Sequence, residues 1–214
     1  MKHLLLILSA IIFYSSLFAQ PVVNGKELYH YVFPSFVQGT VRQKSGEVNK
    51  ALLNYNSLTE EMIFDQSGQK MALDKLEFID TVYMENKRFI LVGKVFYELA
   101  ANTPIALFIQ HKSEIIPPGS NTGFGTTHTS AATNVTDLKA LGMAYQLRLP
   151  DDYILTSNKV FWLKKGNNYY VLKDLKDVQN LFVEKAGAIK EFVKVNKINF
   201  RNAEDLTRLI LFSN

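Results

Sequence analysis

The sequence contains no cysteine in its 214 residues. This absence excludes a disulfide, a thiolate metal site, a cysteine nucleophile and a lipid-modified cysteine. Exported proteins often use disulfides for stability, so an exported chain without them must be held together by its hydrophobic core. The composition allows such a core, because 47% of the residues are hydrophobic and 15 are phenylalanine.

Several catalytic and ligand-binding motifs are missing as well. There is no Gly-x-Ser-x-Gly, and the glycine-rich segment at residues 119–125 lacks the Gly-Lys-Ser/Thr of a phosphate-binding loop. After the first 19 residues the histidines are His30, His111 and His128, each in a different segment and none at metal-ligand spacing. The sequence therefore predicts no catalytic, metal-binding or cofactor-binding residue.

A dense charge of one sign is also missing. The net charge is +4, and the excess is concentrated at residues 151–214, which hold 11 basic and 8 acidic residues. Recognition of a phosphate backbone needs a concentrated basic stripe, which this diffuse excess does not supply. We therefore expect no nucleic-acid partner.

The one long apolar run lies at the start of the chain. Lys2 precedes an apolar segment at residues 4–14, and small residues follow toward Ala19. This pattern is typical of a secretory signal peptide that is cleaved after Ala19. The alternative is an uncleaved anchor, because Leu17 is larger than the residue usually found two positions before the cleaved alanine. We expect an exported protein, periplasmic or extracellular, that is soluble once the signal peptide is removed.

The length indicates one domain. Without a signal peptide at residues 1–19, about 195 residues remain, and a chain of that size buries roughly 70% of its unfolded surface. We predict a β-rich body at residues 20–173 and a C-terminal helical segment at residues 174–214 that packs on the body.

Apolar periodicity predicts the elements of the body. Short apolar runs separated by polar turns at residues 51–99 indicate a β-meander. Both sides of the run at residues 105–109 are apolar, which predicts a central strand. The clearest alternation in the sequence lies at residues 143–149, and a last hairpin is predicted within residues 160–172.

After residue 173 the apolar period changes from 2 to about 3.6, which indicates helices. Asn202 has the features of a helix N-cap, with Glu204 and Asp205 in the first turn. Strands followed by helices favour an α+β fold. We predict an antiparallel β-meander, as a sandwich or partly open barrel of about 8–10 strands, followed by two or three C-terminal helices.

Paired carboxylates occur at Glu60–Glu61 and at Asp151–Asp152. Neighbouring residues in a strand point to opposite faces, and aspartates after a proline are common in turns. A hydrolase would therefore need acidic residues that converge only in the fold.

Two regions could bind a ligand through their surface. Residues 117–134 are rich in Gly, Ser and Thr and are predicted to form a long loop, and such loops are often binding segments or simply disordered. Aromatic side chains of the last hairpin could stack on a sugar or hold a peptide, although core packing is the commoner explanation because aromatic residues are favoured in strands. The binding candidates are Phe124, His128, Trp162, Tyr169 and Tyr170.

A membrane surface is a third possible partner. Lysines flank the apolar stripe of the C-terminal helical segment and could meet anionic lipids. Glu184 and Glu191 lie among them and favour a solvated outer surface instead. The lysines are Lys185, Lys190, Lys194 and Lys197.

The order of several short segments resembles a group of uncharacterised exported bacterial proteins. The resemblance covers nearly the whole chain after the signal peptide, and the group has no known activity, so it implies no catalytic residue. The segments are Leu53-Asn54-Tyr55-Asn56, Glu60-Glu61-Met62, Ile79-Asp80-Thr81-Val82, Leu149-Pro150-Asp151-Asp152-Tyr153, Ile198-Asn199-Phe200 and Glu204-Asp205-Leu206.

Taken together, these features predict an exported, non-catalytic binding or structural module whose partner is an envelope protein or a glycan. The alternatives are an envelope hydrolase with acidic residues brought together by the fold, and a peripheral membrane module that uses the lysine-rich helices.

Overall fold

The computed structural model describes residues 30–116, 120–122, 125–127, 136, 139, 144–146 and 154–214. Ten antiparallel strands form one sheet in the order β14-β13-β8-β7-β6-β5-β1-β2-β3-β4. They are β1 (Val37–Gln43), β2 (Val48–Asn56), β3 (Glu61–Gln66), β4 (Gln69–Ala72), β5 (Ile79–Met84), β6 (Lys87–Val92), β7 (Val95–Ala101), β8 (Ile105–Gln110), β13 (Val160–Lys165) and β14 (Asn168–Leu172).

Most neighbouring strands of this sheet are also neighbours in sequence, joined by tight turns. The turns after Gln43 and Gln66 use Gly46 and Gly68 at positive φ, a conformation that glycine adopts without steric cost. The turn between β5 and β6 has only two residues, because Met84 pairs directly with Lys87. Strands β14 and β4 are the two edges of the sheet, so the sheet is open.

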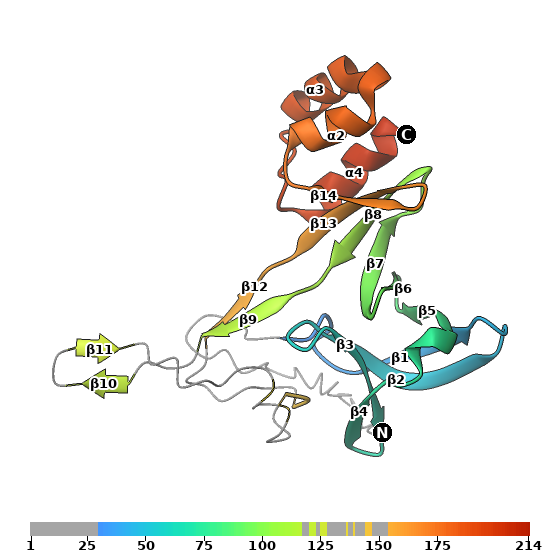
Figure 1. Cartoon of the computed structure of the whole chain (residues 1–214), viewed down its shortest axis with the longest axis vertical. Coiled ribbons are helices and arrows are strands. Elements are labelled where there is room, and N and C mark those ends of the chain that lie inside the picture. Colours follow the sequence, from blue (N-terminus) through green and yellow to red (C-terminus); the bar gives the residue numbers. More distant parts are fainter. Residues whose placement is uncertain are drawn as a thin grey trace, which may run out of the picture.

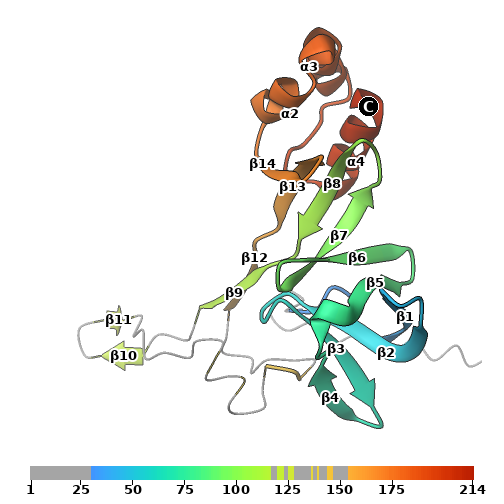
Figure 2. The same ribbon diagram turned by 45° about the vertical axis from the view of Figure 1, so that its right-hand side comes forward.

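Two pairings join strands that are distant in sequence: β1 with β5, where Gly39 lies opposite Met84, and β8 with β13. Strand β13 pairs with β8, and the pairing continues without a change of register into β12 (Ile154–Ser157) and β9 (Ser113–Ile116). Val160 lies opposite Gln110, and Ser157 lies opposite Ser113. The four strands therefore form one continuous two-stranded arm, which extends away from the helices in Figure 1 and Figure 2. A separate small hairpin joins β10 (Ser120–Thr122) to β11 (Gly125–Thr127).

Three helices follow β14 and cover one end of the sheet (Figure 1). Asp174 begins the first with a capping box, in which its side chain accepts hydrogen bonds from the backbone of Lys176 and Asp177. Asn202 begins the last, accepting from the backbone N–H groups of Glu204 (2.9 Å) and Asp205 (3.1 Å). The helices are α2 (Leu175–Leu181), α3 (Ala186–Val195) and α4 (Ala203–Ser213), and single 3₁₀ turns occur at Leu76–Phe78 and Val183–Lys185.

The sheet carries two separate hydrophobic cores. The first joins β7, β8, β13 and β14 to the three helices; its fully buried members include Leu107, Leu163, Val178, Ile189, Leu206 and Leu209. The second lies among the strands of the N-terminal half; its fully buried members include Leu53, Tyr55, Val82, Met84 and Phe89. We call the side of β7, β8 and β13 that meets both cores the inner face, and the opposite side the outer face.

Buried polar groups tie the segment before β1 to the second core. The Asn54 side chain accepts hydrogen bonds from the backbone N–H groups of Phe33 (3.1 Å) and Tyr55 (2.9 Å). Its amide donates to the carbonyl groups of Phe33 (2.8 Å) and Ser35 (3.0 Å). One side chain therefore satisfies four backbone groups, three of which lie in the segment before β1. The backbone of that segment pairs with β2 through the isolated bridge between Tyr31 and Asn56.

The predicted fold class is confirmed. The structure has the α+β fold, the antiparallel meander, the C-terminal helices and the Asn202 N-cap. Residues 105–109 were expected to form a central strand; they belong to β8, which lies inside the sheet, and all five are buried. In the described residues, no helix is long and apolar enough to cross a membrane.

The strand expected at residues 143–149 is wrong for residues 144–146, which form a turn and a bend; the rest of that range lies outside the described residues. Tertiary hydrogen bonds replace a strand ladder at this point. The Ala144 carbonyl accepts from Asn56 Nδ2 (2.7 Å), and the Tyr145 carbonyl accepts from the Tyr31 hydroxyl (3.0 Å).

Replacing Asn54 with alanine should lower the free energy of unfolding by about 2–4 kcal/mol, because four backbone groups lose their partner and several of them are buried. Asn49 lies on the same strand, but it is exposed and its side chain bonds only to Glu47. Asn49→Ala is therefore the matched control, with an expected change within about 0.5 kcal/mol. Urea unfolding of the natural protein and of the two variants measures these free energies. An equal loss of unfolding free energy in the two variants would contradict the role given to Asn54.

Candidate functional site

Aromatic side chains of four strands gather on the outer face at the end of the sheet near the helices. Trp162 on β13 lies directly opposite Phe108 on β8, and Phe108 lies opposite Leu99 on β7. On the other side, Trp162 lies opposite Val171 on β14. Because cross-strand neighbours share a face, these residues form one continuous row across the sheet.

Two ring contacts join this row to the tyrosines above and below it. The rings of Tyr97 and Trp162 are stacked, with centroids 6.0 Å apart and planes 20° apart. The rings of Phe108 and Tyr169 are tilted, with centroids 5.6 Å apart. Tyr97, Trp162 and Tyr169 are each half-buried, whereas Phe108 is buried. We call these four side chains the aromatic face.

A chain of polar groups runs along one edge of the aromatic face. The indole Nε1 of Trp162 donates to Gln110 Oε1 (3.2 Å), and Gln110 Nε2 donates to Glu60 Oε1 (2.6 Å). The other oxygen of Glu60 lies 3.5 Å from Lys112 Nζ. At the opposite edge, Lys164 Nζ lies 5.6 Å from the centre of the Tyr169 ring. Stacked rings are thus bordered by hydrogen-bonding groups on both sides.

The structure separates the candidates that the sequence suggested. Trp162 and Tyr169 lie together on the outer face, where each contacts another aromatic ring. Tyr170 is the next residue along β14 and therefore lies on the inner face, where it is 41% exposed. Phe124 and His128 lie outside the described residues.

The aromatic and polar partners of Trp162 were not predicted from the sequence. Tyr97, Phe108 and Gln110 each belong to predicted strands, but they lie more than fifty residues before Trp162 in the chain. Alternation assigns each residue to one side of its own strand and carries no information about which distant strand lies beside it. The register of β8 with β13 supplies that information.

A second polar group lies on the inner face, between the two hydrophobic cores. Glu98 on β7 accepts from Lys87 Nζ (2.6 Å) through one oxygen and contacts His111 Nε2 (2.7 Å) through the other. Glu98 and His111 are both buried. The rings of Tyr55 and Phe89 lie against His111, each with its centroid 6.2 Å from the imidazole.

Burial and pairing set the charges of this group. Burial lowers the pKa of His111 despite the nearby Glu98 carboxylate. Burial alone would raise the pKa of Glu98, but hydrogen bonds from His111 and Lys87 outweigh it and hold that pKa below its usual value. At neutral pH Glu98 is therefore ionised, and it accepts Nε2–H from a neutral His111 while it pairs with Lys87 Nζ.

Two buried serines lie beside this group without forming a nucleophile. The hydroxyl of Ser57 is 2.7 Å from that of Ser113 and donates to the His30 carbonyl (2.8 Å). Within the described residues, no serine or threonine hydroxyl hydrogen-bonds to His111. A serine nucleophile needs such a bond to its base. The group as placed is therefore a charge-balanced link between the two cores.

The paired carboxylates are also kept apart. Glu60 bonds to Gln110 on the outer face, whereas Glu61 accepts from Lys139 (2.6 Å) and from the Tyr145 hydroxyl (2.9 Å). Asp151 and Asp152 lie outside the described residues. In the part of the chain that the structure describes, no three acidic or histidine side chains are grouped as metal ligands.

His30 is fully buried near the serine pair. Burial lowers the pKa of its imidazole to about 4, although the nearby backbone carbonyl groups of Ala144 and Gln146 act in the opposite direction. The ring is therefore neutral at physiological pH.

Comparison of the chain with protein-family models, curated proteins and solved structures finds no match.

The low pKa of His30 predicts that acid destabilises the fold. The unfolded chain binds a proton at His30 near pH 6.5, but the folded protein does so only near pH 4, so stability is complete above pH 6.5 and decreases below it. Between pH 7.5 and pH 5 this one group should remove about 2 kcal/mol from the free energy of unfolding.

Urea unfolding of the natural protein and of His30→Leu across this pH range measures the effect. Leucine has a similar size and binds no proton, so the loss of stability with acid should be smaller in the variant by that amount. An identical pH dependence in the two proteins would show that His30 is not held neutral by burial.

Proposed function

We propose that the protein is an exported, non-catalytic binding module and that its aromatic face binds a glycan. The observation that carries this proposal is the Tyr97–Trp162 stack with Gln110 and Glu60 hydrogen-bonded at the indole edge. Export rests on the signal-like pattern of the first 19 residues.

The chemistry of a sugar ring complements this surface. A pyranose presents C–H groups on its flat faces, which pack on aromatic rings, and hydroxyl groups around its rim, which need hydrogen-bonding partners. The aromatic face offers half-buried rings from three strands, with an amide and a carboxylate beside them. A rigid sheet holds these groups in place, so little conformational entropy is lost on binding.

The polar groups favour a glycan over a protein partner. Protein interfaces that bind strongly have a desolvated apolar centre and few charges within it. Here Glu60, Gln110, Lys112 and Lys164 lie directly beside the rings. Such groups keep water at the surface, which suits a hydroxylated ligand. In the part of the chain that the structure describes, no comparable arrangement supports the hydrolase or the membrane alternative.

The single tryptophan gives a direct test. Trp162 is the only tryptophan in the sequence, so the intrinsic indole fluorescence reports the aromatic face alone. Titration with chitin, cellulose, mannan and peptidoglycan fragments should produce a saturable shift in emission for at least one of these glycans. Absence of a shift throughout this panel at millimolar concentrations would contradict the proposal.

Two adjacent tyrosines provide a matched pair of variants. Tyr169→Ala should weaken binding of the active glycan about fivefold, because one aromatic contact is worth about 1 kcal/mol. Tyr170→Ala removes the same side chain from the opposite face of the same strand and should leave the affinity unchanged. Equal weakening by both variants would show that the sugar does not bind on the outer face.

A further inference from the structure

Strand β14 is shorter than the arm beside which it lies, so part of the arm has no strand on the side away from β8 and β9. We call the point where β14 ends the step. Strand β14 pairs with β13 as far as Leu172, which lies opposite Phe161, and the chain then turns away to cap α2 at Asp174. The arm itself continues from Val160 back to Ile154 with β8 and β9 on its other side. Residues 154–160 are therefore an exposed strand edge among the described residues.

The backbone of this edge has free hydrogen-bonding groups. The Asn158 N–H donates to the Lys112 carbonyl (2.8 Å), toward the partner strand of the arm. In an antiparallel pair the hydrogen-bonding direction alternates, so the backbone groups of Leu155, Ser157 and Lys159 point to the open side. Within the described residues, nothing hydrogen-bonds to them.

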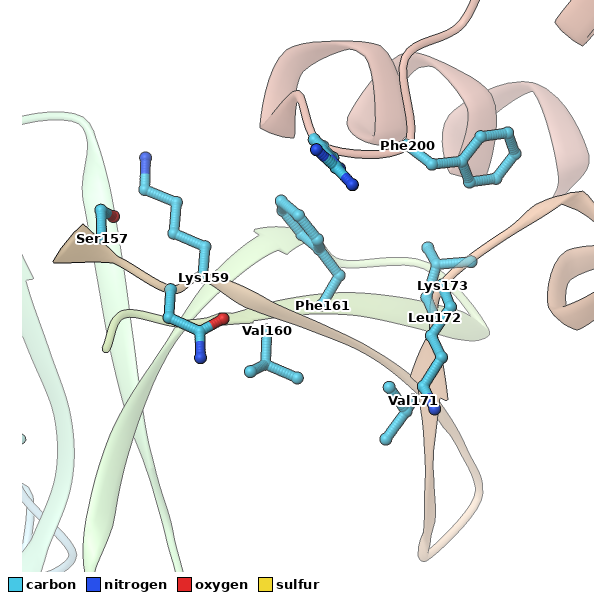
Figure 3. Close-up of a pocket in the computed structure, with 10 residues that line it drawn as sticks. Ser157, Lys159, Val160, Phe161, Val171, Leu172, Lys173 and Phe200 are labelled. Carbon is cyan, nitrogen blue, oxygen red and sulfur yellow. The ribbon is translucent and has the colours of Figure 1, made fainter. Parts of the chain in front are cut away.

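A hollow of about 670 Å³ lies at this step, where β14 ends (Figure 3). Figure 3 shows Lys159, Phe161 and Phe200 on the side of the helices and Val160 and Val171 on the other. Apolar side chains thus line the hollow on both sides of the strand edge. An added strand, whose side chains alternate between two faces, would contact both sets.

The charged groups of the hollow are all positive. Lys159, Lys173 and Arg201 line it, and among the described residues no carboxylate does. None of the three forms an ion pair in the described part of the chain. Asp174 and Asp177, which follow β14, are held in the α2 capping box. A ligand in the hollow would therefore meet three positively charged side chains that have no ion-pair partner in the described residues.

From these observations we propose that the step binds an extended acidic peptide segment of a partner protein. The segment adds as a strand beside residues 154–160, in line with β14, and its Asp or Glu side chains pair with Lys159, Lys173 and Arg201. Main-chain hydrogen bonds supply affinity and the charges supply selectivity, as in other cases of strand addition. This site is independent of the glycan proposal.

Fluorescence polarisation with the purified chain tests the proposal. The probe is a labelled seven-residue peptide, Thr-Glu-Val-Glu-Val-Glu-Thr, which matches the length of the open edge. We expect saturable binding that weakens with salt. The same peptide with lysine in place of glutamate should not bind, and neither should a version N-methylated at every residue, which has no N–H left to donate to the strand edge.

Variants of the chain separate the backbone contribution from the charge contribution. Lys159→Pro and Lys159→Ala remove the same charge, but only proline removes the outward N–H, so Lys159→Pro should bind about 2–10 times more weakly than Lys159→Ala. Changing Lys173 and Arg201 together to glutamate should weaken binding about tenfold or more. Lys94→Glu, in an exposed turn away from the hollow, is the matched control and should have no effect.

Three results would overturn the proposal. They are equal binding of the N-methylated peptide, equal affinities of the proline and alanine variants, and an effect of Lys94→Glu as large as that of the changes in the hollow. Sedimentation at the same protein concentrations gives a further check. Dimerisation that is abolished by Lys159→Pro would show that the edge is occupied by a second copy of the chain and not by an acidic peptide.

Discussion

The antiparallel pairing of β8 with β13 is the constraint on which the rest of the structure depends. It joins residues about 50–60 positions apart, the largest separation in the ten-stranded sheet; the other pairing of strands distant in sequence, β1 with β5, joins residues about 36–45 positions apart. This pairing places Trp162 beside Phe108 on the outer face and Phe161 beside Ile109 on the inner face. A shift of one residue would exchange the two faces and move Trp162 into the core of the helical end.

The same ladder explains why the two cores are separated by polar residues. Along β8 and its continuation, the inner face changes from Leu107 and Ile109 to His111 and Ser113. The helices cover the apolar part, and the N-terminal strands cover the polar part. Glu98, Lys87 and His111 satisfy one another at this boundary, and buried charges are tolerated only with such pairing. The polar boundary between the two cores is therefore a structural feature.

Local features of the fold could be predicted from the sequence, and long-range ones could not. The meander, the central strand β8, the helices and the Asn202 cap follow from periodicity and capping chemistry, which act within a few residues. The alternating pattern around Ala144 was misleading, because hydrogen bonds from Asn56 and Tyr31 hold that segment as a turn. Trp162 and Tyr169 could be suggested from composition, but Tyr97 and Gln110 could join them only through strand pairing.

A cysteine pair across β8 and β13 tests this account most directly, because the natural chain has no cysteine to interfere. Ile105 lies opposite Lys165 in the ladder. The Ile105 N–H donates to the Asn214 side chain and not to Lys165, so Ile105 and Lys165 form a close, non-hydrogen-bonded pair. The double variant Ile105→Cys with Lys165→Cys should form an intramolecular disulfide on mild oxidation, identified by peptide mass mapping. Ile105→Cys with Lys164→Cys, whose side chains lie on opposite faces, should not. Equal cross-linking of the two variants, or none in the first, would contradict the register on which the aromatic face depends.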